Sequence, residues 1–135
     1  MKYLLDVNAL VALGHLHHEF HERVVAWLLG EKSLQLATCS ITELGFVRVL
    51  SQAAAYGFTV PGAKSLLLQM KRNPGLPLEF IRDDHDISNL PGWVKSPAQS
   101  ADGHLAVLAA AHGARLATFD EHIPGAYLIF RKRSR

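Results

Sequence analysis

The sequence predicts an α/β protein, a three-layer α/β/α sandwich with a mostly parallel central sheet. Short apolar runs of strand length alternate along the chain with longer segments in which apolar residues recur at helical spacing. Glycine, proline and asparagine separate many of these segments. Strands that alternate with helices form βαβ units, in which the strands are parallel and the helices cover the faces of the sheet.

The first strand is expected in the apolar run 2–8, which is interrupted by Asp6 and continues into the helix-forming residues 9–13. A second helix ends at Gly30, and its apolar face comprises Phe20, Val24, Trp27 and Leu28. Because this helix is amphipathic, it should cover one face of the sheet.

The next segments repeat the alternation. Residues 34–37 are a short strand candidate, and the helix after them runs from Ser40 to about Ala55, before Gly57. The pattern Ser40-x-x-Glu43 at its start is typical of a capping box.

Another helix begins with Thr59 and Pro61 and stops near residues 73–75, because proline is favoured in the first helical turn and disfavoured in the interior. Residues 78–81 are the third strand candidate. From 83 to 97, aspartate, proline and glycine break the regularity and predict a loop.

The last helix is expected over residues 101–112, with Ser100 as its N-cap and Gly113 as its C-cap. Residues 115–119 are the fourth strand candidate, and 127–130 are a weaker candidate for a fifth.

The 135 residues, 49% of them hydrophobic and 19% charged, fit one globular domain over 1–130 and a basic tail over 131–135. The tail carries four of the 14 basic side chains, so the remainder has 10 basic and 12 acidic ones. Such a tail can attract nucleic acid by releasing counterions, or it can be an ordinary solvated terminus.

A cytoplasmic location is expected. Cys39 is the only cysteine, which excludes an internal disulfide and fits a reducing compartment. The apolar runs are interrupted by charges before membrane-spanning length, and Met1-Lys2 leads into a strand rather than into a signal peptide. We therefore expect neither export nor membrane insertion.

Four acidic residues should lie at one edge of the sheet: Asp6, Glu43, Asp102 and Asp120. Two follow strands and two lie in first helical turns, and parallel strands end where the helices after them begin. Each also has a structural explanation, since Glu43 can close the capping box, Asp102 can favour the helix dipole and a strand-end aspartate can be a turn residue.

Four crowded carboxylates would repel one another and raise their pKa values unless divalent cations neutralised them. Oxygen ligands with little nitrogen or sulfur favour Mg²⁺ or Mn²⁺ over zinc. Such ions polarise a phosphodiester and activate a bound water. The expected chemistry is hydrolysis of a phosphate ester.

The segments 4–8, 40–44, 100–106 and 117–120 resemble, in order and spacing, the motifs of the PIN domain. Within that family, residues 43–51 and 113–120 are similar to the VapC toxins of prokaryotic toxin–antitoxin pairs. The resemblance covers nearly the whole chain and implies a metal-dependent endoribonuclease that acts on RNA, forms a homodimer and is inhibited by a small cognate VapB-like antitoxin.

The resemblance also implies roles for individual residues. Asp6, Glu43 and Asp102 would hold the metal, and Asp120 would complete the site directly or through water. The residues that would orient these carboxylates are Asn8, Ser40 and Thr118. Two positions depart from the family pattern: Gly103 stands where many members have alanine, and Ala101 stands where a threonine is usual.

Other signals leave alternatives open. Arg48 and His104 are candidate contacts to RNA or to a partner. The histidines 15, 17, 18 and 21 suggest a zinc site, but His18-Glu19-Phe20-His21-Glu22 misses the zinc-protease pattern because residue 22 is not histidine. The alternatives to a ribonuclease are a PIN-fold binding module that does not cleave, and a flap-like DNA nuclease that uses the same ions.

Overall fold

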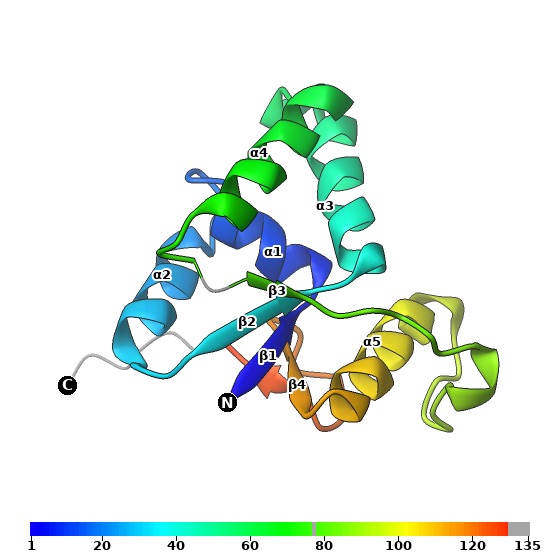
Figure 1. Cartoon of the computed structure of the whole chain (residues 1–135). Coiled ribbons are helices and arrows are strands. Elements are labelled where there is room, and N and C mark those ends of the chain that lie inside the picture. Colours follow the sequence, from blue (N-terminus) through cyan, green and yellow to red (C-terminus); the bar gives the residue numbers. More distant parts are fainter. Residues whose placement is uncertain (77, 130–135) are drawn as a thin grey trace.

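Figure 1 shows the computed structural model of the chain, which describes residues 1–76 and 78–129. Its centre is a five-stranded sheet in the order β3-β2-β1-β4-β5, and every neighbouring pair of strands is parallel. The strands are β1 Lys2–Leu5, β2 Gln35–Thr38, β3 Leu78–Phe80, β4 Ala114–Thr118 and β5 Tyr127–Leu128. The parallel sheet of the predicted fold class is confirmed.

Helices cover both faces of this sheet. Four of them pack on one face: α1 Val7–Gly14, α2 His21–Gly30, α3 Ser40–Gln52 and α4 Val60–Arg72, while α5 Ser100–Ala111 packs on the other. The strand residues divide accordingly, because successive side chains point to opposite faces. Leu5 joins the larger apolar cluster with α1 to α4, and Leu4 joins the smaller one with Leu105 and Leu108 of α5.

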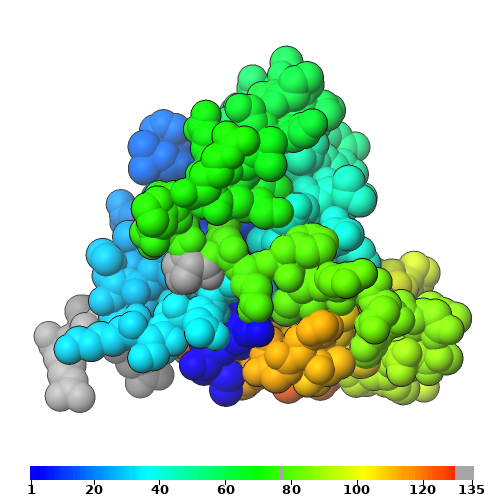
Figure 2. Space-filling view, in the orientation of Figure 1, coloured from blue at the N-terminus to red at the C-terminus, as the bar shows by residue number. Residues whose placement is uncertain are grey.

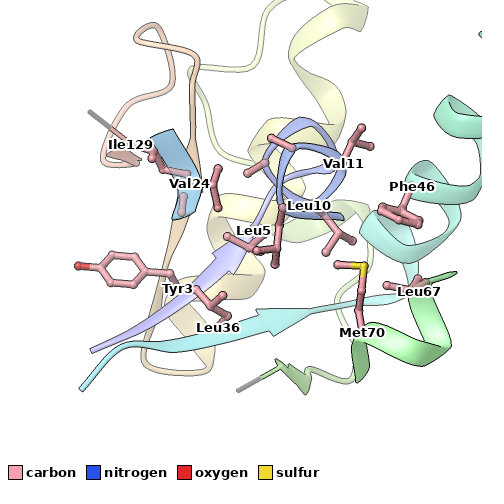
Figure 3. Packing of buried hydrophobic residues seen from close by; sticks show 14 of the residues in the cluster. Tyr3, Leu5, Leu10, Val11, Val24, Leu36, Phe46, Leu67, Met70 and Ile129 are labelled. Carbon is pink, nitrogen blue, oxygen red and sulfur yellow. The ribbon is translucent and has the colours of Figure 1, made fainter. Parts of the chain in front are cut away.

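The larger cluster fixes the α3–α4 pair against α1. Figure 3 shows Phe46 of α3, and Leu67 and Met70 of α4, converging beside Leu10 of α1. Leu10 and Phe46 are completely buried, and burial of a side chain of this size stabilises the fold by about 1.5–3 kcal/mol. The packing therefore sets where the first turn of α3 lies relative to the end of β1.

Three predicted helix caps are wrong, two at N-termini and one at a C-terminus, where His112 rather than Gly113 is the C-cap of α5. Cys39, rather than Ser40, is the N-cap of α3, and its backbone N–H donates to the hydroxyl of Thr42 at 3.0 Å. Glu43 is consequently not part of a capping box. Ser100 is the first residue of α5, after Gln99 as N-cap.

The connecting segments are mostly as expected. Gly57 and Gly113 have φ angles of +68° and +69°, which suit glycine and end the elements before them. Three short 3₁₀ helices complete the structure: η1 Ala54–Tyr56, η2 Ile87–Asn89 and η3 Pro97–Gln99. In Figure 2 the light-green segment that follows β3 lies beside the orange residues at the end of α5 and the start of β4.

The element bounds differ by a few residues from those predicted. α3 stops at Gln52 and is followed by η1, β3 stops at Phe80, and β4 begins at Ala114. Phe130 and the basic tail 131–135 lie outside the described residues. Within residues 1–76 and 78–129, no helix has both the length and the apolar character needed to span a membrane.

Candidate functional site at the carboxyl edge of the sheet

Acidic residues gather around the carboxyl ends of the strands. Asp6 directly follows β1, and Asp120 comes two residues after the end of β4. Asp102 lies in the first turn of α5, which packs on the face of β1 and β4. In a parallel sheet these positions share one edge, where α/β proteins bind their ligands.

Asp6 is the most buried of these carboxylates. Its Oδ1 accepts a hydrogen bond from the backbone N–H of Ala9 at 2.8 Å and so caps α1. Burial raises the pKa of Asp6, hydrogen bonds from Thr118 and Ala9 lower it, and the negative charges of Asp102 and Asp120 raise it; the net shift is upward. The Asp6 carboxylate is therefore held in place, but its ionised form is disfavoured by its surroundings.

The ionised form of Asp102 is also disfavoured. Partial burial raises its pKa first, and the charge of Asp120 raises it further. Asp6, Asp102 and Asp120 thus form one electrostatically coupled group, which we call the aspartate cluster. Its donors are carboxylate oxygens, the chemistry that hard divalent cations such as Mg²⁺ and Mn²⁺ prefer.

The aspartate cluster is not a finished coordination sphere. Across residues 1–76 and 78–129, no three His, Cys, Asp or Glu side chains stand in an arrangement that could hold a metal ion. The donor set fits a hard cation in its chemistry, so ligation would require the side chains to rotate toward one another.

Glu43 is held separately from the aspartate cluster. Its Oε2 accepts hydrogen bonds from the Thr38 hydroxyl at 2.6 Å and from Lys71 Nζ at 2.7 Å. Sequence reasoning missed both partners. Thr38 carried a signal, because it ends the buried strand β2 as Thr118 ends β4, but Lys71 lies 28 residues away on α4 and carried none.

The residues expected to orient the carboxylates have different surroundings. Thr118 is buried, lowers the pKa of Asp6 and accepts a hydrogen bond from the backbone N–H of Asp120 at 3.0 Å. Asn8 Oδ1 instead accepts from His18 Nε2 at 3.0 Å. Ser40 is exposed and makes no side-chain hydrogen bond to a described residue. An orienting role for Asn8 and Ser40 stays a prediction.

The four histidines before and in α2 shape a loop. Nδ1 of His15 accepts from the backbone N–H of His17, and Nδ1 of His18 accepts from that of Phe20. His21 Nδ1 lies 2.7 Å from the carbonyl oxygen of Ala12. These bonds hold His15 and His18 against the backbone of the loop and His21 against α1. No group of three within the described ranges could hold zinc.

His104 fastens the loop after β3 to α5. Its Nε2 lies 2.5 Å from Asp83 Oδ2, and both side chains are largely buried. Burial acts to raise the pKa of Asp83, but hydrogen bonds from His104 and from the His85 N–H, with the nearby imidazole charges, bring the pKa below its ordinary value. The exposed fraction of the His104 side chain is 19%, and a contact to RNA there stays a prediction.

Close packing around Gly103 explains why glycine stands where many family members have alanine. A Cβ built there would overlap Val94 Cγ2 and would lie 3.3 Å from Pro91 Cδ. The loop therefore packs directly on the helix backbone beside Asp102, and glycine is needed for this approach.

Two partly buried aromatic rings, one of them next to Asp120 in the chain, pack together with an arginine. Phe119, which directly precedes Asp120, packs on Phe20 with ring centroids 4.6 Å apart. The Arg23 guanidinium lies 4.4 Å from the centroid of the Phe20 ring. Arg48, the cation expected from the sequence to contact RNA or a partner, is exposed on α3, and its contact stays a prediction.

Comparison with known proteins agrees with this geometry. The sequence pattern of the PIN domain family matches residues 3–127. Ribonuclease VapC44 of Mycobacterium tuberculosis is 38% identical over 129 residues, covering 91% of this chain and 89% of that protein. Ribonuclease VapC38 of the same species is 36% identical over 124 residues, covering 87% and 84% of the two chains.

The fold has a solved counterpart. The crystal structure of VapBC2 from Rickettsia felis bound to a DNA fragment from its promoter contains a chain that superposes with a TM-score of 0.59. The match covers 95% of this chain and 97% of that one at 20% sequence identity, so it supports the fold alone. The acid-bearing motifs, the parallel sheet and the similarity to named VapC ribonucleases together show that this chain belongs to the PIN domain family.

Proposed function

We propose that the chain is a divalent-metal-dependent endoribonuclease that acts as the toxin of a type II toxin–antitoxin pair. The observation that carries this proposal is the aspartate cluster at the carboxyl edge of the sheet, where burial and the charge of Asp120 raise the pKa values of Asp6 and Asp102. The similarity to relatives named as ribonucleases supports RNA as the substrate.

The proposed ligands of Mg²⁺ or Mn²⁺ are Asp6, Glu43 and Asp102, with Asp120 bound directly or through water. When bound, such an ion polarises the phosphodiester and lowers the pKa of a water. The protein's own residues hold the carboxylates: the backbone N–H of Ala9 fixes Asp6, and the Thr38 hydroxyl fixes Glu43.

RNA would approach along the same edge. The partly exposed rings of Phe20 and Phe119 and the Arg23 guanidinium are candidate contacts, because single-stranded RNA is bound by aromatic stacking and positive charge. Arg48 on the exposed side of α3 is a second candidate phosphate contact. These groups would orient the RNA strand, and the carboxylates would determine where the RNA is cut.

A groove between α3, α4 and β3 supports binding of a small antitoxin. It has a volume of about 540 Å³ and is mainly apolar, and its exposed apolar residues are Leu44, Val60, Leu68 and Phe80. Exposed apolar surface of this kind is typical of protein–protein contacts. The groove also includes Glu43, so an antitoxin bound there would lie against the proposed metal site. A homodimer and a cytoplasmic location complete the proposal.

Purified chain incubated with single-stranded RNA in Mg²⁺, Mn²⁺ or EDTA tests the activity. We expect cleavage only with metal, and none by Asp6→Asn, which keeps the cap on α1 because asparagine caps helices as aspartate does. Circular dichroism of the variant controls for folding. RNA binding without metal-dependent cleavage would contradict the proposal and favour a binding module, and preferential cleavage of DNA would favour a flap-like nuclease.

A further inference from the structure

Lys71 and Thr38 hold Glu43 through the same oxygen. Both donate to Oε2, at 2.7 and 2.6 Å. The other oxygen, Oε1, makes no hydrogen bond to a described residue, and it is not among the buried polar atoms that lack a partner. Glu43 is thus fixed by one oxygen while the other remains accessible.

Lys71 is guided to this position by its own surroundings. It lies in the last turn of α4, next to the buried Met70. Its Nζ is 5.2 Å from the centroid of the Phe80 ring, within the range of a cation–π contact. The exposed fractions of the Lys71 and Glu43 side chains are 28% and 21%. The pair is therefore less screened by water than a surface ion pair.

The position of this ammonium group matters for a metal site. Lys71 pairs its positive charge with Glu43, a candidate metal ligand. In this arrangement no three acidic, histidine or cysteine side chains of the described residues are placed to hold a metal ion. A divalent ion beside Glu43 would be repelled by the ammonium group or would have to displace it.

We propose that Lys71 is an internal cation that occupies Glu43 in the metal-free protein and is displaced when a divalent ion binds. Lys71 is then a positioning residue that sets metal affinity. This inference rests on the proposed metal-dependent function.

Calorimetric titration of the full chain with Mn²⁺ alone tests the inference without any activity assay. Lys71→Met keeps an apolar stem against Phe80 and removes the charge, so we expect about tenfold tighter Mn²⁺ binding. Lys71→Arg, which keeps the charge, should bind within about twofold of the unmodified chain. Lys32→Met, at an exposed position between α2 and β2 and so at the opposite edge of the sheet, should also stay within about twofold because its charge is solvated.

Two further measurements separate this role from a structural one. In a Glu43→Gln background, Lys71→Met should no longer change the Mn²⁺ affinity, because the competing pair is already gone. Without metal, Lys71→Met should unfold at a lower temperature than the unmodified chain, since Glu43 loses its counterion, and saturating Mn²⁺ should raise its Tm by more. Lys71→Gln, which keeps a hydrogen-bond donor, repeats the titration if the methionine variant does not fold.

Unchanged or weaker Mn²⁺ binding by the folded Lys71→Met or Lys71→Gln variant would overturn the inference while leaving the proposed function intact. Failure of the unmodified chain to bind Mn²⁺ would overturn the metal site and the inference together.

Discussion

The contact between Gly45 and Val7 determines how closely two candidate ligands approach. Gly45 lies two residues after Glu43 on α3, and Val7 directly follows Asp6 at the start of α1. A Cβ built on Gly45 would overlap Val7 Cγ2 and would lie 3.0 Å from Val7 Cγ1. Substitution of Gly45 by alanine should therefore push α3 away from α1.

The size of the effect follows from two opposing contributions. Overpacking of a tight contact costs about 1–3 kcal/mol. Alanine recovers about 1 kcal/mol of helix propensity over glycine. We expect Gly45→Ala to lower the free energy of unfolding by about 1 kcal/mol net, which corresponds to a decrease in Tm of roughly 4 °C for a domain of this size. Metal-dependent RNA cleavage should fall as well, because the carboxylates are displaced.

Thermal and denaturant unfolding measure this change, with Gly30→Ala as the matched control. Gly30 ends α2, and no atom lies within 4 Å of a Cβ built there, so this variant should be neutral or slightly stabilised. Val7→Ala removes the overlapping methyl groups, and the double variant should be more stable than the sum of the single effects. A Gly45→Ala variant as stable as the unmodified chain, or strict additivity in the double variant, would show that the contact between Gly45 and Val7 does not limit the approach of α3 to α1.

Three further changes test other contacts. Asp6→Asn should be more stable than the unmodified chain at pH 7, because the pKa of Asp6 is raised in the folded protein and its ionisation therefore destabilises the fold. Urea denaturation should show this difference in stability disappear as the pH falls to about 4, the ordinary aspartate range. Asp83→Asn should lower the free energy of unfolding by about 1–2 kcal/mol at pH 7, because it weakens the bond to His104. Since the pKa of Asp83 is lowered on folding, urea denaturation should show this loss diminish as acid protonates the carboxylate of the unmodified chain. Gly103→Ala should increase hydrogen exchange in the loop 83–97, where the added Cβ meets Val94, and unchanged exchange would contradict the packing described.

Much of the fold could be predicted from local patterns. The alternation of short apolar runs and amphipathic segments indicates a parallel sheet, because that pattern is set by burial on both faces. The helix caps could not be predicted as reliably. Ser40 and Ser100 have the chemistry of N-caps, but each is the first residue of its helix, and the N-cap is the residue before it, Cys39 or Gln99.

The candidate site, like the fold, could be predicted from the sequence only in part. The positions of Asp6, Asp102 and Asp120 at one edge follow from strand and helix ends, which sequence patterns locate. The ion pair between Glu43 and Lys71 depends on how α4 packs across α3, and no local pattern encodes that packing. Sequence reasoning therefore identified the acids and missed the cation paired with one of them.

We propose that a divalent cation relieves the repulsion among the crowded carboxylates at this edge. Carbon-detected NMR titration of the Asp6 and Asp102 carboxyl groups, with and without saturating Mg²⁺, tests it most directly. We expect the pKa of each group to lie above its ordinary value without metal and to fall below that value with Mg²⁺. Ordinary pKa values in the metal-free protein, or raised values that Mg²⁺ leaves unchanged, would contradict the account.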